Sequence, residues 1–70
     1  MGSVVKVIEL IAQSETSWDD AAKNAVAEAA KTITNIKSIW VDNQTAEVEG
    51  NRIVSYRLNV KVSFLVAGDR

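Results

Sequence analysis

The sequence has 70 residues, 47% of them hydrophobic and 24% charged, with a formal net charge of −1. This length allows a single domain, 1–70, and the composition excludes a disordered or collagen-like chain. No apolar run approaches the roughly 18 residues of a membrane span. A net charge this close to zero gives no strong attraction to nucleic acid or to an anionic membrane, so we expect neither as a partner.

The residue types that are missing exclude most enzyme classes. The chain has no Cys, no His and no Pro, and only three Gly. Without Cys and His there is no disulfide framework, no thiolate nucleophile, no zinc–cysteine site and no general base of the usual kind. Three glycines cannot build a phosphate-binding loop. We therefore expect no enzyme, and the absence of a secretory signal at the start predicts a cytoplasmic protein.

The first predicted element is a strand over residues 4–11, a stretch rich in β-branched residues. Apolar residues occur at both parities along this strand. We therefore expect one face to lie on the core and the other in a subunit interface. The polar residues 13–16 are expected to end the strand.

A helix is predicted from residue 18 to residue 34 or 36, because apolar residues recur there at helical spacing. Ser17 is the expected N-cap, and Asp19 and Asp20 lie at the positive end of the helix dipole. The same two carboxylates could join a calcium site, since Ca²⁺ takes oxygen ligands, but helix-start electrostatics explains them more simply. The Ala-rich apolar stripe of this helix is expected to pack closely on a sheet.

Two further strands are predicted over 39–48 and 53–65, joined by a turn at 49–51 in which Gly50 is free to take positive φ. In the last strand, the even-numbered residues are apolar and predicted to face the core, whereas those from 55 to 63 with odd numbers are polar. The order β-α-β-β predicts an α+β fold, a three-stranded antiparallel sheet of order 1-3-2 packed on one helix. Its two edge strands are a liability unless another subunit covers them.

Trp40 is predicted to leave the sheet on the side away from the core, because its neighbours Ile39 and Val41 are the natural core pair. Gln44 has the same parity as Trp40 and is expected on the same side. An indole in this position either packs in a subunit interface or stacks on a planar ligand, and we favour the interface.

Arg57 is expected on the non-core face of the last strand, close to the surface that carries Trp40. Its guanidinium can meet a phosphate, pair with a carboxylate such as Asp42, or lie along apolar surface with its head in water. The sequence leaves these three alternatives open.

Several stretches, taken in their order and spacing, match a known family. They are Val5-Lys6-Val7-Ile8-Glu9-Leu10, Ser14-Glu15-Thr16-Ser17-Trp18 with Ala21-Ala22, Tyr56, and Val60-Lys61-Val62-Ser63-Phe64. From about Val4 to Leu65 the chain thereby resembles the dodecins, small β-α-β-β proteins that assemble as hollow homododecamers and commonly bind flavins. No single motif is very specific, but the combination of order, length and spacing is.

The resemblance implies ligand-binding positions at which this chain departs from the flavin-binding dodecins. Ser38 stands where those proteins carry a Trp that stacks on the flavin ring, and Arg57 stands where a Gln contacts the polar edge of the ring. Thr45 replaces a basic residue often found midway along the second strand. Trp40 lies two residues beyond Ser38 and is the candidate replacement for the stacking ring. These departures resemble a subgroup of small dodecins associated with divalent cations.

The resemblance therefore implies a homododecameric shell that binds or stores a small molecule. The ligand would be a flavin such as FMN or riboflavin, held weakly or in an altered way, or another planar or phosphorylated compound. The alternative is a structural or calcium-binding dodecamer without flavin. The candidate ligand-binding residues are Ser38, Trp40, Thr45 and Arg57. No metal ligand is assigned.

Overall fold

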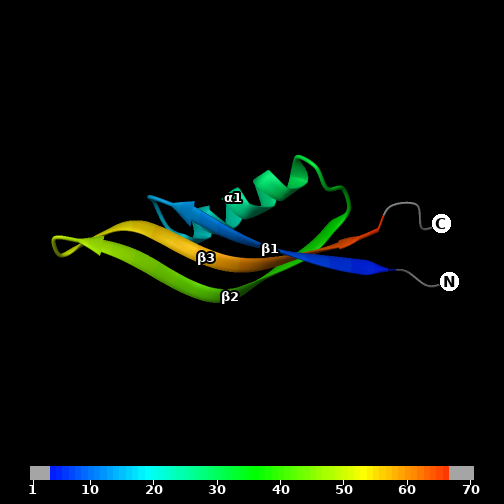
Figure 1. The fold of residues 1–70 in the computed structure, drawn as a ribbon. Helices are drawn as coiled ribbons and strands as arrows, with labels where there is room; N and C mark the ends of the chain where they lie inside the picture. The colour runs from blue at the N-terminus through cyan, green and yellow to red at the C-terminus, as the bar shows by residue number, and fades with distance from the viewer. Residues whose placement is uncertain (1–3, 67–70) are drawn as a thin grey trace.

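The computed structural model describes residues 4–66, which form a three-stranded sheet with one helix on one side (Figure 1). The elements are β1 (Val5–Ser14), α1 (Trp18–Ala30), β2 (Ile36–Glu49) and β3 (Arg52–Leu65). β3 lies between β1 and β2 and is antiparallel to both, which gives the strand order β1-β3-β2. The predicted α+β fold is confirmed. Within the described residues, no helix has the length and apolar character needed to cross a membrane.

The core lies between α1 and the side of the sheet formed by β1 and β3. Leu58, Val60 and Val62 of β3 are at most 3% exposed, which confirms the inward direction of the even-numbered residues along the middle of this strand. Alanine side chains on α1 face them and let the helix approach the sheet closely. These are Ala21, Ala25 and Ala29.

The corner between β1 and α1 is held by two serine hydroxyl groups. The buried Ser14 Oγ donates to Asp20 Oδ2 at 2.7 Å and accepts from the Thr16 amide at 2.9 Å. Ser17 is the N-cap, as predicted, and its Oγ accepts from the Asp20 amide at 3.0 Å. Asp20 therefore serves the start of the helix, in agreement with the simpler of its two explanations.

The helix ends at Ala30, several residues before the predicted end at 34 or 36. Its last turn tightens, because the amides of Lys31 and Thr32 donate to carbonyls three residues earlier. The β-branched residues that follow are weak helix formers, and Asn35 reverses the chain with a φ of 62°. Ile33 and Ile36 still pack against the core. The helical spacing of apolar residues therefore continues beyond Ala30, although the helix itself does not.

All three strands extend beyond their predicted ends. The first strand does end within the polar residues 13–16, but it ends at Ser14, because the pairs Ala12–Leu58 and Ser14–Tyr56 carry β1 past its predicted end at residue 11. Cross-strand pairing and burial of Ser14 outweigh its polar character. β2 likewise begins at residue 36 instead of 39 and ends at 49, and β3 begins at 52 instead of 53.

The turn between β2 and β3 contains two residues, Gly50 and Asn51, with φ of 54° and 72°. Positive φ at both central residues is typical of the type I′ turn that matches the twist of a hairpin. The predicted turn is therefore confirmed, and it closes a hairpin that extends beyond the end of β1 (Figure 1).

The helix packs over β1 and β3 and barely reaches β2. Val41 pairs with Val60 and points toward the helix side of the sheet. Because the helix does not cover it, Val41 remains 45% exposed. Ile39, its expected core partner, is half-buried. The predicted directions of these two side chains are confirmed, but one short helix does not bury them fully.

Truncating Tyr56 to alanine should destabilise the protein by about 2–3 kcal/mol, because its half-buried ring would leave a hole beside Trp18. The two rings meet edge to face with centroids 4.9 Å apart and an angle of 80° between planes. Tyr56→Phe keeps the ring and should cost less than about 1 kcal/mol, as should Arg57→Ala on the other face. Urea unfolding at one fixed protein concentration measures these costs, and a larger loss for Arg57→Ala would contradict the strand orientation.

Candidate functional site

The side of the sheet away from α1, here called the outer face, carries all four candidate residues. Ser38, Trp40 and Thr45 lie on β2 and Arg57 lies on β3. Strict alternation would place Thr45 on the opposite side from Ser38. A bulge between Val41 and Asn43 shifts the register by one residue, so that Thr45 pairs directly with Arg57.

The same bulge corrects the prediction for Gln44, which was expected on the side of Trp40. Gln44 pairs with Leu58, whose side chain is in the core, so it belongs to the helix side of the sheet. One extra residue in a strand reverses the direction of every later side chain. The directions predicted from alternation along β2 are therefore correct up to Asp42 and reversed after it. A bulge of this kind has no clear signature in a single sequence.

Arg57 connects the three strands on the outer face. Its Nη2 donates to Gln13 Oε1 of β1 at 2.9 Å, its Nε reaches the same oxygen at 3.3 Å, and Nη2 lies 3.6 Å from Glu47 Oε2 of β2. Of the three expected roles, Arg57 therefore pairs with a carboxylate, but its partner is Glu47 and not the suggested Asp42. Its Nε and Nη2 are already engaged, so a new anion on that side of the guanidinium would have to compete with Glu47.

Lys61 forms a second cluster about midway along the sheet. Its Nζ lies 3.6 Å from Asp42 Oδ2 and 4.0 Å from Glu9 Oε2. The same ammonium lies 5.3 Å from the centre of the Trp40 ring, a cation–π contact with its cross-strand neighbour. Trp40 is nevertheless 59% exposed, so part of the indole is accessible in the protomer.

Ser38 is tied to β3 through a pair of hydroxyl groups. The Oγ atoms of Ser38 and Ser63 are 2.7 Å apart, and Ser63 Oγ also lies 3.3 Å from the Ser38 carbonyl oxygen. This arrangement presents polar oxygen atoms and no aromatic plane. The position that the family resemblance assigns to a stacking ring is therefore occupied by a small hydrogen-bonded pair.

Sequence reasoning missed the partners of the candidate residues. Gln13, Glu47, Lys61 and Ser63 all contribute to the outer-face clusters. Alternation along β3 already indicated that Lys61 and Ser63 leave the sheet on the side of Arg57, so these two could have been found. Gln13 could not, because it was assigned to a loop.

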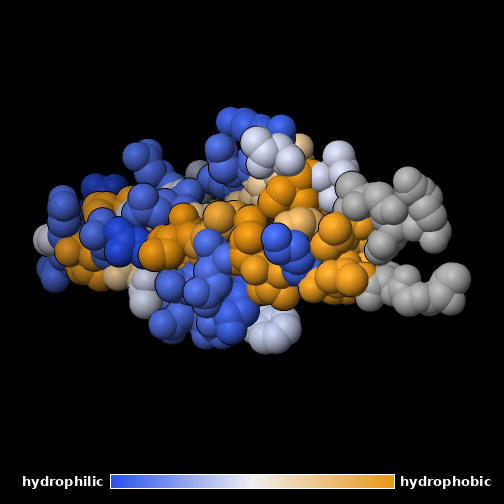
Figure 2. Space-filling model, turned by 45° about the vertical axis from the view of Figure 1, so that its right-hand side comes forward, coloured by the Kyte–Doolittle hydropathy of each residue, from blue (hydrophilic) through white to orange (hydrophobic). Residues whose placement is uncertain are grey.

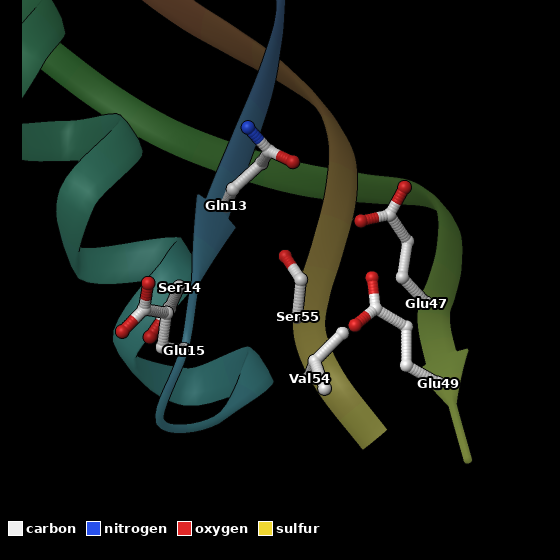
Figure 3. A pocket seen from close by; sticks show the side chains of 7 residues that line it. All are labelled: Gln13, Ser14, Glu15, Glu47, Glu49, Val54 and Ser55. Carbon is white, nitrogen blue, oxygen red and sulfur yellow. The ribbon is translucent and has the colours of Figure 1, made fainter. Parts of the chain in front are cut away.

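A polar groove lies where the hairpin extends past the end of β1 (Figure 3). It has a volume of about 600 Å³, and its lining includes Gln13, Glu15 and Ser55. The carboxylates of Glu47 and Glu49 point the same way from β2, and Glu15 lies across the groove (Figure 3). These oxygens suit a hard cation, but within residues 4–66 no three acidic side chains come together as a metal-binding group.

The outer face can bind ligands only through exposed groups that are not already paired. Charge is largely balanced within the two clusters, and the accessible groups are the Trp40 ring and the polar oxygen atoms along β2.

Comparison with known proteins gives consistent matches. The family model described as Dodecin matches residues 4–67. Calcium dodecin of Mycobacterium tuberculosis is 39% identical over 62 residues, which cover 89% of this chain and 87% of that protein. These matches span nearly the whole domain.

Solved structures agree with the fold. The crystal structure of the calcium-chelating antigen calcium dodecin of Mycobacterium tuberculosis superposes with a TM-score of 0.81 at 35% identity, covering 97% of both chains. A Thermus thermophilus dodecin, solved as a mutant, superposes with a TM-score of 0.89 at 26% identity, covering 93% of this chain and 97% of that one.

The Arg57–Glu47 pair should contribute little to stability. Both side chains are well exposed, at 38% and 59%, so a double-mutant cycle with Arg57→Gln and Glu47→Gln should give a coupling of about 0.2–1 kcal/mol. The coupling should fall with added salt, because exposed charges are screened. Urea unfolding at low and high salt and one protein concentration tests this. A coupling far above 1 kcal/mol that ignores salt would contradict an exposed pair.

Proposed function

The chain belongs to the dodecin family, and from that premise we propose that it forms a homododecamer that binds Ca²⁺ and holds flavin weakly or not at all. The observation that carries the proposal is the Ser38–Ser63 hydroxyl pair, which occupies the stacking position without an aromatic ring. The Mycobacterium tuberculosis relative, at 39% identity, is named for calcium. The sequence analysis placed a flavin-type ligand first and calcium as the alternative, and this proposal places calcium first.

Flavin recognition needs an aromatic plane and an in-plane partner that both donates and accepts hydrogen bonds. Ser38 supplies no plane, and Arg57 only donates. Arg57 is also engaged by Gln13 and Glu47, so a flavin edge would have to displace them and leave a guanidinium without its anion. Both departures from the family pattern lower the affinity for flavin.

Self-association is supported by the amount of apolar surface that one protomer leaves uncovered. β1 and β2 are both edge strands. On the outer face of β1, Val5, Val7 and Ile11 are all more than half exposed. A row of exposed apolar residues beside an open strand edge is typical of a surface that another chain covers. Figure 2 shows apolar patches running along the side of the molecule between polar ones.

Calcium binding, in this proposal, depends on assembly. Ca²⁺ takes six to eight oxygen ligands, and in residues 4–66 the acidic side chains of one protomer do not form a group of three. Carboxylates such as Glu47 and Glu49 therefore need oxygen atoms from water or from a neighbouring copy to complete a site. Since no His or Cys is present in the chain, oxygen-loving cations fit its chemistry better than zinc or copper.

Flavin storage remains the second candidate because of one observation, the exposed Trp40 ring on the outer face. It lies two residues beyond Ser38, about 6–7 Å along the strand. Lys61 covers part of the ring, but the rest is accessible. A planar ligand that stacked on Trp40 would occupy a displaced position compared with the family site.

Freshly purified protein should be colourless and should bind Ca²⁺ in isothermal titration calorimetry, with a fixed stoichiometry per assembly. Light scattering should give twelve times the protomer mass. Removal of Ca²⁺ with a chelator should lower the melting temperature, because a ligand that binds only the folded state stabilises it. A yellow protein without bound calcium would favour the flavin alternative. A monomer or dimer at micromolar concentration would contradict the assembly.

Riboflavin fluorescence should be barely quenched by nanomolar amounts of this protein. Replacing Ser38 by Trp and Arg57 by Gln together restores a stacking plane and a donor–acceptor edge, and should raise affinity at least about tenfold, or about 1.4 kcal/mol. Trp40→Ala is the matched control. Strong quenching by the unmodified protein that disappears in Trp40→Ala would instead make Trp40 the stacking residue.

A further inference from the structure

Two side chains of α1 donate hydrogen bonds to the backbone of the two edge strands. The Trp18 indole Nε1 donates to the Thr45 carbonyl oxygen of β2 at 2.9 Å, and the Asn24 amide Nδ2 donates to the Gln13 carbonyl oxygen of β1 at 3.0 Å. Both distances are those of well-formed N–H···O hydrogen bonds. The helix is therefore attached to both edges of the sheet.

The two carbonyl groups flank the same residue of the central strand. Gln13 pairs with Arg57 across β1 and β3, and Thr45 pairs with Arg57 across β2 and β3. The three residues form one row across the sheet, here called the Arg57 row: Gln13, Arg57 and Thr45. The helix thus binds the backbone at both ends of this row from one side of the sheet, whereas the Arg57 guanidinium lies on the other side, the outer face.

The side-chain contacts of the Arg57 row depend on that backbone. Gln13 points from β1 toward β3 (Figure 3), and its Oε1 accepts from Arg57 Nη2 at 2.9 Å and from Nε at 3.3 Å. Glu47, two residues after Thr45, lies 3.6 Å from the same Nη2. Exposed side chains lose rotamer freedom when they bind one another, so such contacts hold only where the backbone places both partners well.

The two donors of α1 come from a firmly held part of the fold. Ser14 Oγ donates to Asp20 Oδ2, and Ser17 caps the first turn of the helix. The Trp18 ring lies edge to face against Tyr56, the residue before Arg57 on β3. A hydrogen-bond donor on a fixed element can hold its acceptor in place, which a donor on a mobile segment cannot do.

We propose that Trp18 and Asn24 are positioning residues for the outer face. By binding the carbonyl groups at both ends of the Arg57 row, they keep Gln13 and Glu47 in place and so keep the guanidinium of Arg57 engaged. Each of them acts through a neighbouring strand. An anionic ligand that approaches the outer face then meets a guanidinium that already has partners. The inference concerns the folded chain and depends neither on calcium nor on the number of copies in the assembly.

The reactivity of Arg57 toward phenylglyoxal tests the inference. The reagent condenses with two nitrogens of a guanidinium group, so a guanidinium engaged at Nε and Nη2 should react slowly. Mass spectrometry of the digested protein gives the rate at Arg57, and the exposed Arg52 serves as the internal reference. Asn24→Leu and Trp18→Phe each remove one donor. Each should raise the Arg57 rate about two- to tenfold relative to Arg52, or about 0.4–1.4 kcal/mol, as expected for one hydrogen bond.

Two further variants show whether the effect passes through the proposed partners. Lys23→Leu is the matched control at the exposed position before Asn24; within residues 4–66 Lys23 donates no hydrogen bond to the sheet, so the Arg57 rate should not change. Gln13→Leu removes the direct partner of Arg57 and should raise the rate at least as much as Asn24→Leu. Adding Asn24→Leu to Gln13→Leu should raise it no further. Circular dichroism checks the fold of each variant.

The inference is overturned if both helix variants leave the Arg57 rate unchanged, or if Lys23→Leu raises it equally. An unchanged rate in Gln13→Leu would overturn it too, because the guanidinium is then not restrained by its partner. The same holds if Asn24→Leu adds its full effect to Gln13→Leu, or if the Arg52 rate rises in parallel, since either result indicates general loosening of the sheet. If Trp18→Phe fails to fold, the Asn24 comparison decides.

Discussion

One geometric constraint governs this protein: a 13-residue helix must cover a three-stranded sheet whose outer strands have 10 and 14 residues. The helix contacts the sheet through alanines, and Ala21 is fully buried. Close approach gives tight packing over β1 and β3, but it leaves Val41 and part of Ile39 uncovered on β2. The folded protomer is therefore incomplete on the same side that carries its core. Oligomerisation is one way in which small domains gain the burial that a single chain lacks.

The outer face solves a different problem, since no helix covers it. Polar side chains on β3 pair with acidic or amide groups of both neighbouring strands, Arg57 with Gln13 and Glu47, and Lys61 with Asp42. These pairs add little stability each, because they are exposed. They neutralise the cations that an anionic or phosphorylated ligand would otherwise find.

Much of the fold could be predicted from the sequence because period-two alternation in β3 is nearly perfect, and β3 is the central strand. The buried Val60 and Val62 follow from this alternation, the turn follows from Gly50, and the strand order follows from the β-α-β-β order of the elements. The end of α1 was wrong because apolar spacing persists after Ala30 while the backbone bends at Asn35. The candidate site was found as separate residues through a family resemblance, but its partners depend on a bulge and on a longer β1, which local sequence does not encode.

The two sides of β2 carry different kinds of side chain. Ile39 and Val41 lie on the helix side of the sheet, whereas Ser38 and Trp40 lie on the outer face, and Thr45 joins them there only because of the bulge at Asp42. A change that removed the bulge would turn Thr45 toward the helix side and Gln44 toward Arg57. The same change would alter the path of the strand toward the turn at Gly50 and Asn51. A single extra residue in β2 therefore decides both which of its side chains lie beside Arg57 and which lie on the side of the helix.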